Sequence, residues 1–377
     1  MKISNISCNT KFKGYDVMPL RGLYMQGWEG FRGQKITTEM SAIAKEENIP
    51  LYINNYGKIT KDESKSLPCF YDSFSIWAQD TKNFLCNGKE KILLCNDRDA
   101  VIKRENLGDL CDYNIISRPH LPRGGNFFIG YKPNGERYII VSAKTTINNP
   151  KSLYDSDSSI QQHKGLYNNY ELVTLHEISQ KFNVEMENIY LLDTAYEDLD
   201  MLIRPIGYPY VLVNDCDETY RNMEKLQEKN PYNKKQITHH EMYGYAYMYK
   251  RQCRDIQESL RKMGFEPIEI GGNYFYNINF LNAIAFRNKN GGISYITNSV
   301  RDSGPEWEGL EEIFENDLRA SVDNIENVYF VSGGNARENG FPYSARPDVN
   351  AMMYWLGENR GGIHCMTAEI PDFDVIA

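Results

Sequence analysis

Short apolar runs alternate with helical patterns along the whole chain. Apolar positions at helical spacing predict helices over residues 37–47, 172–182, 239–263 and 310–322. Runs typical of buried strands occupy residues 50–53, 91–95, 189–192, 267–270 and 328–331, and residues 201–213 form two extended stretches. Turn residues between apolar runs predict hairpins over residues 126–142 and 274–296. This alternation predicts an α/β fold.

One short fragment recurs at similar places in this pattern. Gly-Gly-Asn occurs at residues 124–126, 271–273 and 333–335. Glycine permits tight turns and close approach of another chain segment, so three copies favour several repeats of one α/β module. No linker or low-complexity segment interrupts the pattern, and we expect one domain over residues 1–377, with residues 225–235 as a surface loop.

Composition and net charge reduce the number of functions that the chain could have. The chain of 377 residues has 41% hydrophobic and 25% charged residues, which is ordinary for a globular protein. Its net charge of −9 argues against a nucleic-acid partner and is compatible with cationic substrates. The first residues lack the apolar core of a signal peptide, and no apolar run has membrane-spanning length. We therefore expect no membrane partner and a cytoplasmic location, with secretion through a signal-independent route and homo-oligomers left open.

The eight cysteines are scattered, without a CxxC pair or zinc spacing, so reduced thiols and no metal are expected. Cys365 stands out, because it follows Gly361-Gly362 in a segment predicted to be a short strand. A cysteine thiolate can attack an electrophilic carbon, whereas most free cysteines are small buried apolar residues. His364 is not expected to act as its base, because neighbouring strand residues point to opposite faces.

The segment Gly361-Gly362-Ile363-His364-Cys365-Met366-Thr367 resembles the nucleophile motif of the guanidine-modifying enzymes, in particular agmatine and peptidyl-arginine deiminases. Two further segments resemble this superfamily and appear in the expected order. Residues 76–80 (Ile-Trp-Ala-Gln-Asp) are similar to its Trp-x-Arg/Gln-Asp segment, and residues 197–201 (Glu-Asp-Leu-Asp-Met) to its His-x-Asp segment. The similar region covers most of the chain, from about residue 76 to residue 371.

The resemblance implies the pentein fold, an α/β-propeller with five pseudo-symmetric modules around a central active site. It implies a cysteine-dependent deiminase for arginine, agmatine or peptidyl-arginine, with Cys365 as the nucleophile and a covalent thiouronium intermediate. Asp80 and Asp200 would hold the guanidinium, a planar cation well matched by paired carboxylates, and Trp77 and Gly362 would also contact the substrate. No cofactor is implied, and the partner is a small guanidino substrate or a protein arginine; calcium dependence would accompany the protein-arginine case.

One departure from the superfamily concerns proton transfer. Asp198 stands where the motif has a histidine that protonates the leaving group and activates water. An aspartate can do this near neutral pH only if burial or a like charge stabilises its protonated form, and Asp200 would supply that charge. Either Asp198 is the acid/base, or another histidine reaches the site from elsewhere in the chain (His120, His163, His176, His239 or His240). The alternatives are an amidinotransferase of the same fold and a non-catalytic protein that binds guanidinium compounds or a partner.

Overall fold

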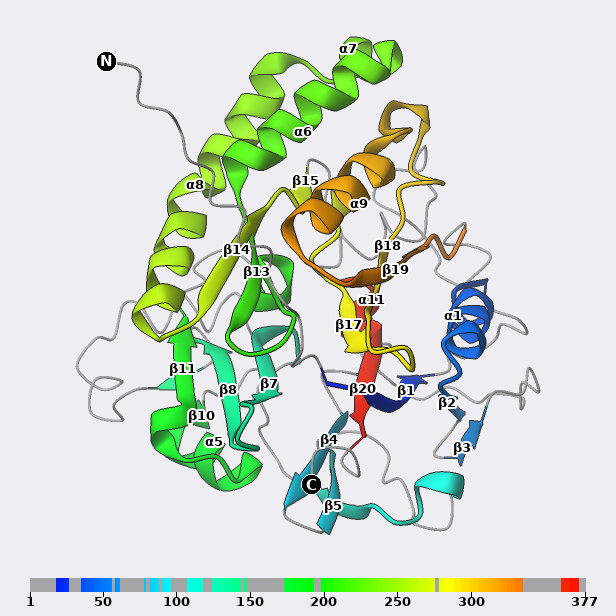
Figure 1. Cartoon of the computed structure of the whole chain (residues 1–377), viewed down its shortest axis with the longest axis vertical. Helices are drawn as coiled ribbons and strands as arrows, with labels where there is room; N and C mark the ends of the chain where they lie inside the picture. The colour runs from blue at the N-terminus through cyan, green and yellow to red at the C-terminus, as the bar shows by residue number, and fades with distance from the viewer. Residues whose placement is uncertain are drawn as a thin grey trace, which may run out of the picture.

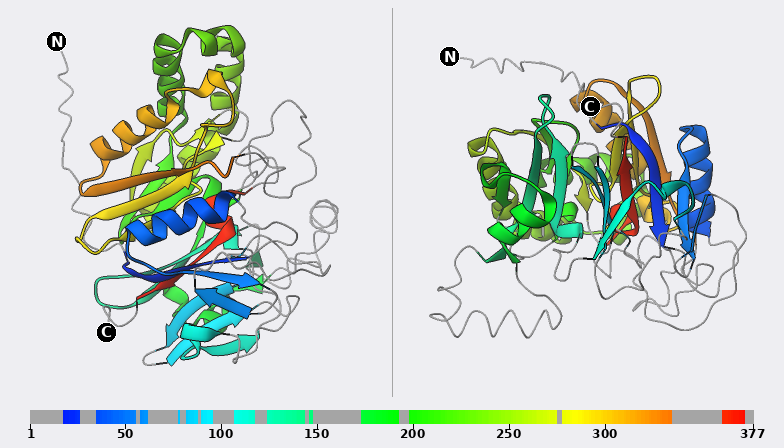
Figure 2. Two further views of the ribbon diagram at one scale, coloured as in Figure 1. Left: turned by 90° about the vertical axis from the view of Figure 1, so that its right-hand side faces the viewer. Right: turned by 90° about the horizontal axis from the view of Figure 1, so that it is seen from below.

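A computed structural model of the chain describes residues 18–26, 35–55, 58–61, 78, 82–87, 90–95, 107–117, 124–143, 146–147, 173–192, 198–274, 278–334 and 361–372. Within these ranges helices and strands alternate (Figure 1), as the apolar pattern predicts. In Figures 1 and 2 the helices α1, α5 and α8 lie at the periphery, and the last strand, β20, lies near the middle.

Five sheets in the described part of the chain share one pairing scheme. In each, a first strand pairs antiparallel with a second, which pairs parallel with a third. The first strands are β4 (Lys82–Asn87), β7 (Phe127–Tyr131), β12 (Ile203–Pro205), β17 (Ile284–Arg287) and β20 (Thr367–Pro371). The second strands are β5 (Glu90–Cys95), β8 (Arg137–Ser142), β13 (Tyr210–Asn214), β18 (Ile293–Asn298) and β1 (Leu20–Gln26). The third strands are β6 (Asn114–Ser117), β11 (Ile189–Leu192), β14 (Glu266–Ile270), β19 (Ile325–Val331) and β2 (Leu51–Asn55), and β3 (Lys58–Lys61) extends the last sheet.

Helices connect the parallel strands, because a parallel pair needs a crossover. Those described in full between such strands are α1 (Lys35–Glu46), α5 (Leu175–Phe182), α6 (Cys216–Lys229), α7 (Pro231–Gln236), α8 (His239–Lys262) and α9 (Leu310–Ser321). Two short pairs, β9 (Thr146–Ile147) with β10 (Val173–Thr174) and β15 (Asn273–Tyr274) with β16 (Ile278–Asn279), complete the strands. None of the helices in the described ranges is both long and apolar enough to cross a membrane.

The predicted surface loop at residues 225–235 is wrong. This segment forms the end of α6 and most of α7. The boundary between the two helices is Asn230, whose side chain accepts hydrogen bonds from the backbone N–H groups of Tyr232 and Asn233, with Pro231 at the first helical position. The polar composition suggested a loop, but one face of α6 buries Met223 and Leu226.

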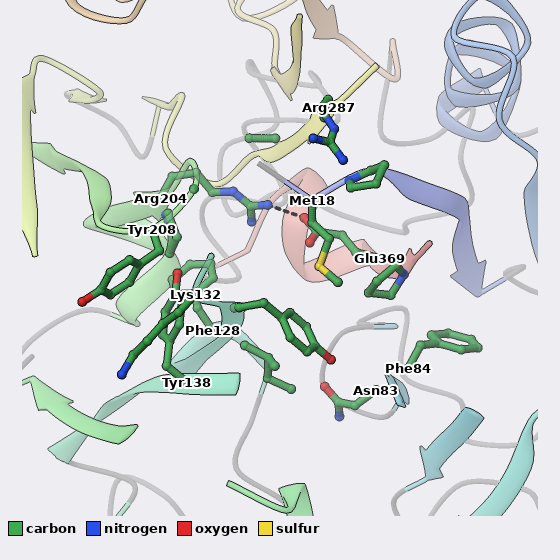
Figure 3. A pocket seen from close by; sticks show the side chains of 18 of the residues that line it. Met18, Asn83, Phe84, Phe128, Lys132, Tyr138, Arg204, Tyr208, Arg287 and Glu369 are labelled. Carbon is green, nitrogen blue, oxygen red and sulfur yellow. Dashed lines mark hydrogen bonds and ion pairs between the residues drawn. The ribbon is translucent and has the colours of Figure 1, made fainter. Parts of the chain in front are cut away.

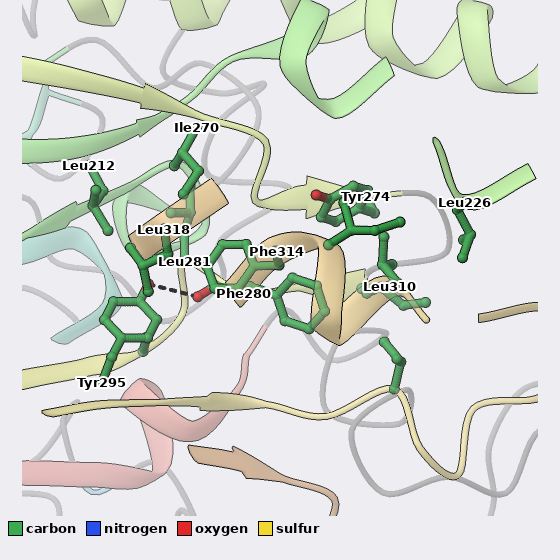
Figure 4. Packing of buried hydrophobic residues seen from close by; sticks show 14 of the residues in the cluster. Leu212, Leu226, Ile270, Tyr274, Phe280, Leu281, Tyr295, Leu310, Phe314 and Leu318 are labelled. Carbon is green, nitrogen blue, oxygen red and sulfur yellow. Dashed lines mark hydrogen bonds between the residues drawn. The ribbon is translucent and has the colours of Figure 1, made fainter. Parts of the chain in front are cut away.

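The core of the second half packs α9 against the strands around it (Figure 4). Phe314 of α9 is fully buried, and its ring centroid lies 4.6 Å from that of Phe280. Tyr295 on β18 packs in the same cluster, and its hydroxyl donates a hydrogen bond of 2.8 Å to the Phe280 carbonyl oxygen. These contacts hold the segment that leads into Asn282, a residue of the site described below.

Replacing Phe314 with alanine should lower the free energy of unfolding by about 3–5 kcal/mol, because it removes a fully buried ring from a close-packed core. Urea denaturation measures this. Glu312→Gln on the same helix is the control: it removes only an exposed ion pair with Lys229 and should change stability by less than about 1 kcal/mol. Equal stability of Phe314→Ala and the parent would contradict this packing.

Candidate active site

A single helical turn, α11 (Ile363–Met366), presents Cys365 directly before β20. Two asparagine side chains hold the start of this turn. Asn298 accepts a hydrogen bond from the backbone N–H of Ile363, and Asn282 accepts one from that of His364, each 3.0 Å long. A Cβ at Gly362 would lie 2.6 Å from both asparagine side chains, so glycine is required by their close approach.

Asp200 is the centre of the cluster around Cys365. It is completely buried in the short helical segment η6 (Leu199–Met201). Its Oδ2 atom lies 2.8 Å from Cys365 Sγ, 2.7 Å from Asn282 Nδ2 and 3.0 Å from His364 Nδ1. Asn282 Nδ2 also lies 3.3 Å from the sulfur. The thiol, the imidazole and the amide therefore share one carboxylate oxygen.

The other oxygen of this carboxylate, Asp200 Oδ1, has no hydrogen-bond partner in the described structure and is buried. It faces Gly125, where an added Cβ would lie 3.0 Å away. A buried acceptor without a partner costs roughly 1–3 kcal/mol. Such a group in a native site is explained when a ligand supplies the missing donor.

Burial and charge set the protonation of this cluster. Burial, with the nearby charge of Asp198, raises the pKa of Asp200 to about 7. Burial, with the positive charge of Arg204, lowers the pKa of His364 to about 3, so its imidazole is neutral at physiological pH. The His364 ring packs on Phe128, with centroids 5.1 Å apart. Asp200 therefore titrates near neutral pH, whereas His364 does not.

Asp198 lies two residues before Asp200 and is half-buried. Its Oδ1 accepts a hydrogen bond of 2.9 Å from Asn126 Nδ2. Asn126 ends the first Gly-Gly-Asn corner, η3 (Gly124–Asn126), and the second corner supplies Asn273, whose side chain donates to the Met201 carbonyl oxygen. Two of the three repeated corners thus hold the segment with both acids; Asn335 of the third lies outside the described residues.

The structure brings together four of the six residues predicted for the site: Cys365, Gly362, Asp200 and Asp198. Trp77 and Asp80 lie outside the described residues, as do His120 and His163. Three other histidines considered as substitutes for the missing one lie exposed on helices: His176 beside Gln180, His239 beside Tyr220, and His240.

The argument against His364 is wrong. It assumed a strand, in which neighbouring side chains diverge, but residues 363–366 form a helical turn. His364 and Cys365 consequently meet at Asp200 Oδ2. Sequence reasoning also missed Asn282 and Asn298, for which the sequence carries no motif.

A cavity of about 300 Å³ lies next to α11 (Figure 3). Side chains from the first strands of all five sheets line it: Phe84 from β4, Phe128 from β7, Arg204 from β12, Arg287 from β17 and Glu369 from β20. Arg204 Nη2 donates to Glu369 Oε1 across it. No group of three or more His, Cys, Asp or Glu side chains in the described ranges is arranged to hold a metal ion.

Comparison with known proteins shows the fold. No protein-family model and no curated protein sequence matches the chain. Among solved structures, an agmatine deiminase from C. jejuni aligns with a TM-score of 0.53 at 12% identity, covering 96% of each chain. A cysteine-to-serine variant of a C. jejuni agmatine deiminase with substrate bound aligns with a TM-score of 0.52 at 12% identity, again over 96% of both chains. The N-terminal domain of the cyanobacterial arginine dihydrolase ArgZ covers 93% of this chain and 98% of its own, at 10% identity and a TM-score of 0.42.

The chain therefore has the fold of agmatine deiminase, the pentein fold that its motifs predict. The described elements do not by themselves close into a propeller, and the arrangement of five equivalent modules stays a prediction, as does the single domain over residues 1–377.

Proposed function

We propose that the chain is a guanidino-group hydrolase, a deiminase that uses Cys365 as its nucleophile. One observation carries this proposal: the Cys365 thiol lies 2.8 Å from a fully buried carboxylate whose second oxygen has no partner. A cation with several N–H donors, placed beside the sulfur, would donate a hydrogen bond to that oxygen. The fold shared with agmatine deiminase supports the same chemistry.

The unpartnered Asp200 Oδ1 would accept a hydrogen bond from the guanidinium, in the charge-assisted form that carboxylates make with this group. Asp80 and Trp77 would also contact the substrate, because residues 76–80 resemble the Trp-x-Arg/Gln-Asp segment of the superfamily. The neutral His364 and Asn282 would keep the carboxylate in place, because both contact Oδ2. The cavity bordered by all five first strands supports five modules around a central site.

The reaction would proceed in two stages. Asp200 Oδ2 takes the thiol proton, and the sulfur forms a bond to the guanidinium carbon. The thiol proton passes from Asp200 to Asp198, which delivers it to the leaving nitrogen. The tetrahedral adduct then loses ammonia and leaves a thiouronium on Cys365. Water, activated by Asp198, then adds to the same carbon, the C–S bond breaks, and the ureido product and the thiol are released.

Replacing Asp198 with asparagine should lower kcat by roughly 10²–10⁴-fold, the usual contribution of a positioned acid/base, while KM changes little. Steady-state formation of ureido product measures both constants. Asn126 can still contact the asparagine, so the substitution removes the proton-transfer group and preserves its position. Asp217→Asn on exposed α6, which loses only surface ion pairs, is the matched control. If Asp198→Asn had the same kcat as the parent, another group would have to transfer the protons.

The substrate class is part of the same proposal. Free arginine, free agmatine and arginine in a protein present the same guanidinium, and parallel assays with all three would rank them. An amidinotransferase would require an added amine acceptor for turnover. A protein that only binds guanidinium compounds would form no product and would be indifferent to Cys365→Ser.

A further inference from the structure

Two cysteines meet where the helices α6 and α8 pack side by side (Figure 1). Cys216 is the first residue of α6, and Cys253 lies in the second half of α8. Both side chains are buried, and their sulfur atoms lie 3.5 Å apart, with the Cys216 thiol as the hydrogen-bond donor. Because a disulfide bond is about 2.05 Å long, the two sulfurs need to approach by only about 1.5 Å to form one.

The side chain of Asn214, the last residue of β13, contacts both sulfurs. Its Nδ2 atom lies 3.6 Å from Cys253 Sγ and 3.8 Å from Cys216 Sγ. Hydrogen bonds from Cys216 and from this amide lower the pKa of the Cys253 thiol, whereas the hydrogen bond to Cys253, together with burial, raises the pKa of Cys216. Since the thiolate is the reactive form of cysteine, Cys253 is the sulfur that an oxidant attacks first.

Asn214 also holds two neighbouring backbone segments. Its Oδ1 atom accepts hydrogen bonds from the backbone N–H groups of Gly272 and Asn273, at 3.1 and 2.8 Å. Its own backbone N–H donates to the Leu202 carbonyl oxygen at 2.9 Å. Because Asn214 is only two residues from Cys216, a movement of Cys216 toward α8 displaces Asn214 and weakens these hydrogen bonds.

Both backbone segments contact the residues that follow Asp200. Leu202 is two residues after Asp200, and the side chain of Asn273 donates to the carbonyl oxygen of Met201, the residue between them. The thiol pair is therefore connected to the segment of the buried carboxylate through Asn214 and Asn273.

We propose that Cys216 and Cys253 form a reversible disulfide switch that acts on the segment carrying Asp200. The oxidant is a hydroperoxide such as hydrogen peroxide. The Cys253 thiolate attacks one peroxide oxygen, which gives a sulfenic acid and a hydroxide that takes up a proton to become water. The Cys216 sulfur then attacks the Cys253 sulfur, the disulfide bond forms, and the sulfenic hydroxyl leaves as a second water with the Cys216 proton.

In this reaction the two thiols lose two electrons and two protons, and the peroxide is reduced to two waters. A dithiol reductant restores both thiols by exchange. The effect on Asp200 regulates catalysis only if the proposed function holds, whereas the disulfide and the displacement of Asn214 do not depend on that function.

Peptide mapping tests the disulfide. The reduced full-length protein is treated with hydrogen peroxide, denatured, alkylated at its remaining thiols and digested without reductant. We expect mass spectrometry to find one pair of peptides linked through Cys216 and Cys253, and to lose that link after dithiothreitol treatment. Cys111→Ala removes an exposed thiol and should form the same link. If Cys216 and Cys253 are recovered only as alkylated thiols or as unlinked oxidised acids, the proposal is overturned.

Hydrogen exchange tests the effect on the segment that carries Asp200. In the oxidised protein the backbone N–H groups of Asn214, Gly272 and Asn273 should exchange about threefold to tenfold faster, because each loses most of one hydrogen bond. Unchanged exchange of all three in a protein that carries the disulfide would overturn the switch.

Cys253→Ala, treated with peroxide in the same way, controls for oxidation of other thiols such as Cys365. Its three N–H groups should exchange at the same rate before and after peroxide. Should this variant fail to fold, Cys216→Ala serves the same purpose, because either substitution removes the pair. Acceleration by peroxide in the variant as in the parent would assign the effect to another thiol and contradict the proposal. None of these measurements requires turnover, so they remain decisive even if no guanidino compound is a substrate.

Discussion

Cys365→Ala should lose ureido product formation by at least about 10⁴-fold, because the proposed covalent bond to the guanidinium carbon is formed by its sulfur. The thiol is buried, held by the asparagine-bound turn, and placed 2.8 Å from a carboxylate that can take its proton. Alanine leaves Asp200, Asn282 and His364 in contact with one another. The variant should therefore still bind guanidino compounds, which calorimetry detects.

The matched control is Cys111→Ala, which removes an exposed cysteine and should keep full activity. Loss of activity in both variants would indicate a general effect of thiol loss. Product formation by Cys365→Ala at the parent rate would place the chemistry elsewhere.

Asp200→Asn should reduce kcat/KM by roughly 10²–10³-fold, because a buried charged partner of a cation typically contributes 2–5 kcal/mol. The substitution preserves shape and removes the charge and the proton acceptor together. Kinetics with the best guanidino substrate measure the loss. Wild-type kcat/KM in Asp200→Asn would mean that this carboxylate neither holds the substrate nor accepts the thiol proton.

The pH dependence supplies a second test of Asp200. Its pKa is about 7 in the free protein, and a guanidinium binds the ionised carboxylate. Substrate affinity should therefore rise as the pH rises through about 7, and fall by up to about tenfold for each pH unit below it. Asp200→Asn should lose this dependence.

The residues of this site that could be predicted from the sequence are those that belong to short motifs. Cys365, Gly362, Asp198 and Asp200 belong to short motifs of adjacent residues, and the structure brings these motifs together. The Gly-Gly-Asn repeats also marked positions that matter, because Gly125 and Asn126 contact Asp200 and Asp198. Short motifs of this kind can be recognised in a single sequence.

The features that were not predicted from the sequence have physical explanations. Asn282 reaches Cys365 across 83 positions of sequence, and no local pattern encodes such a contact. His364 was rejected because the apolar residues around it suit a strand, while capping by Asn282 and Asn298 produces a helical turn. The two helices at residues 216–236 were missed because polar faces dominate them, although Asn230-Pro231 is a helix-start signal that was present.

The most direct test of the central claim is mass spectrometry of the peptide containing Cys365 after acid quench during turnover of arginine or agmatine. We expect an adduct on Cys365 equal in mass to the substrate minus ammonia, and no such adduct in Cys365→Ala. An adduct consisting of the amidino group alone would identify an amidinotransferase. Rapid product formation without any adduct, retained in Cys365→Ala, would contradict covalent catalysis by this cysteine.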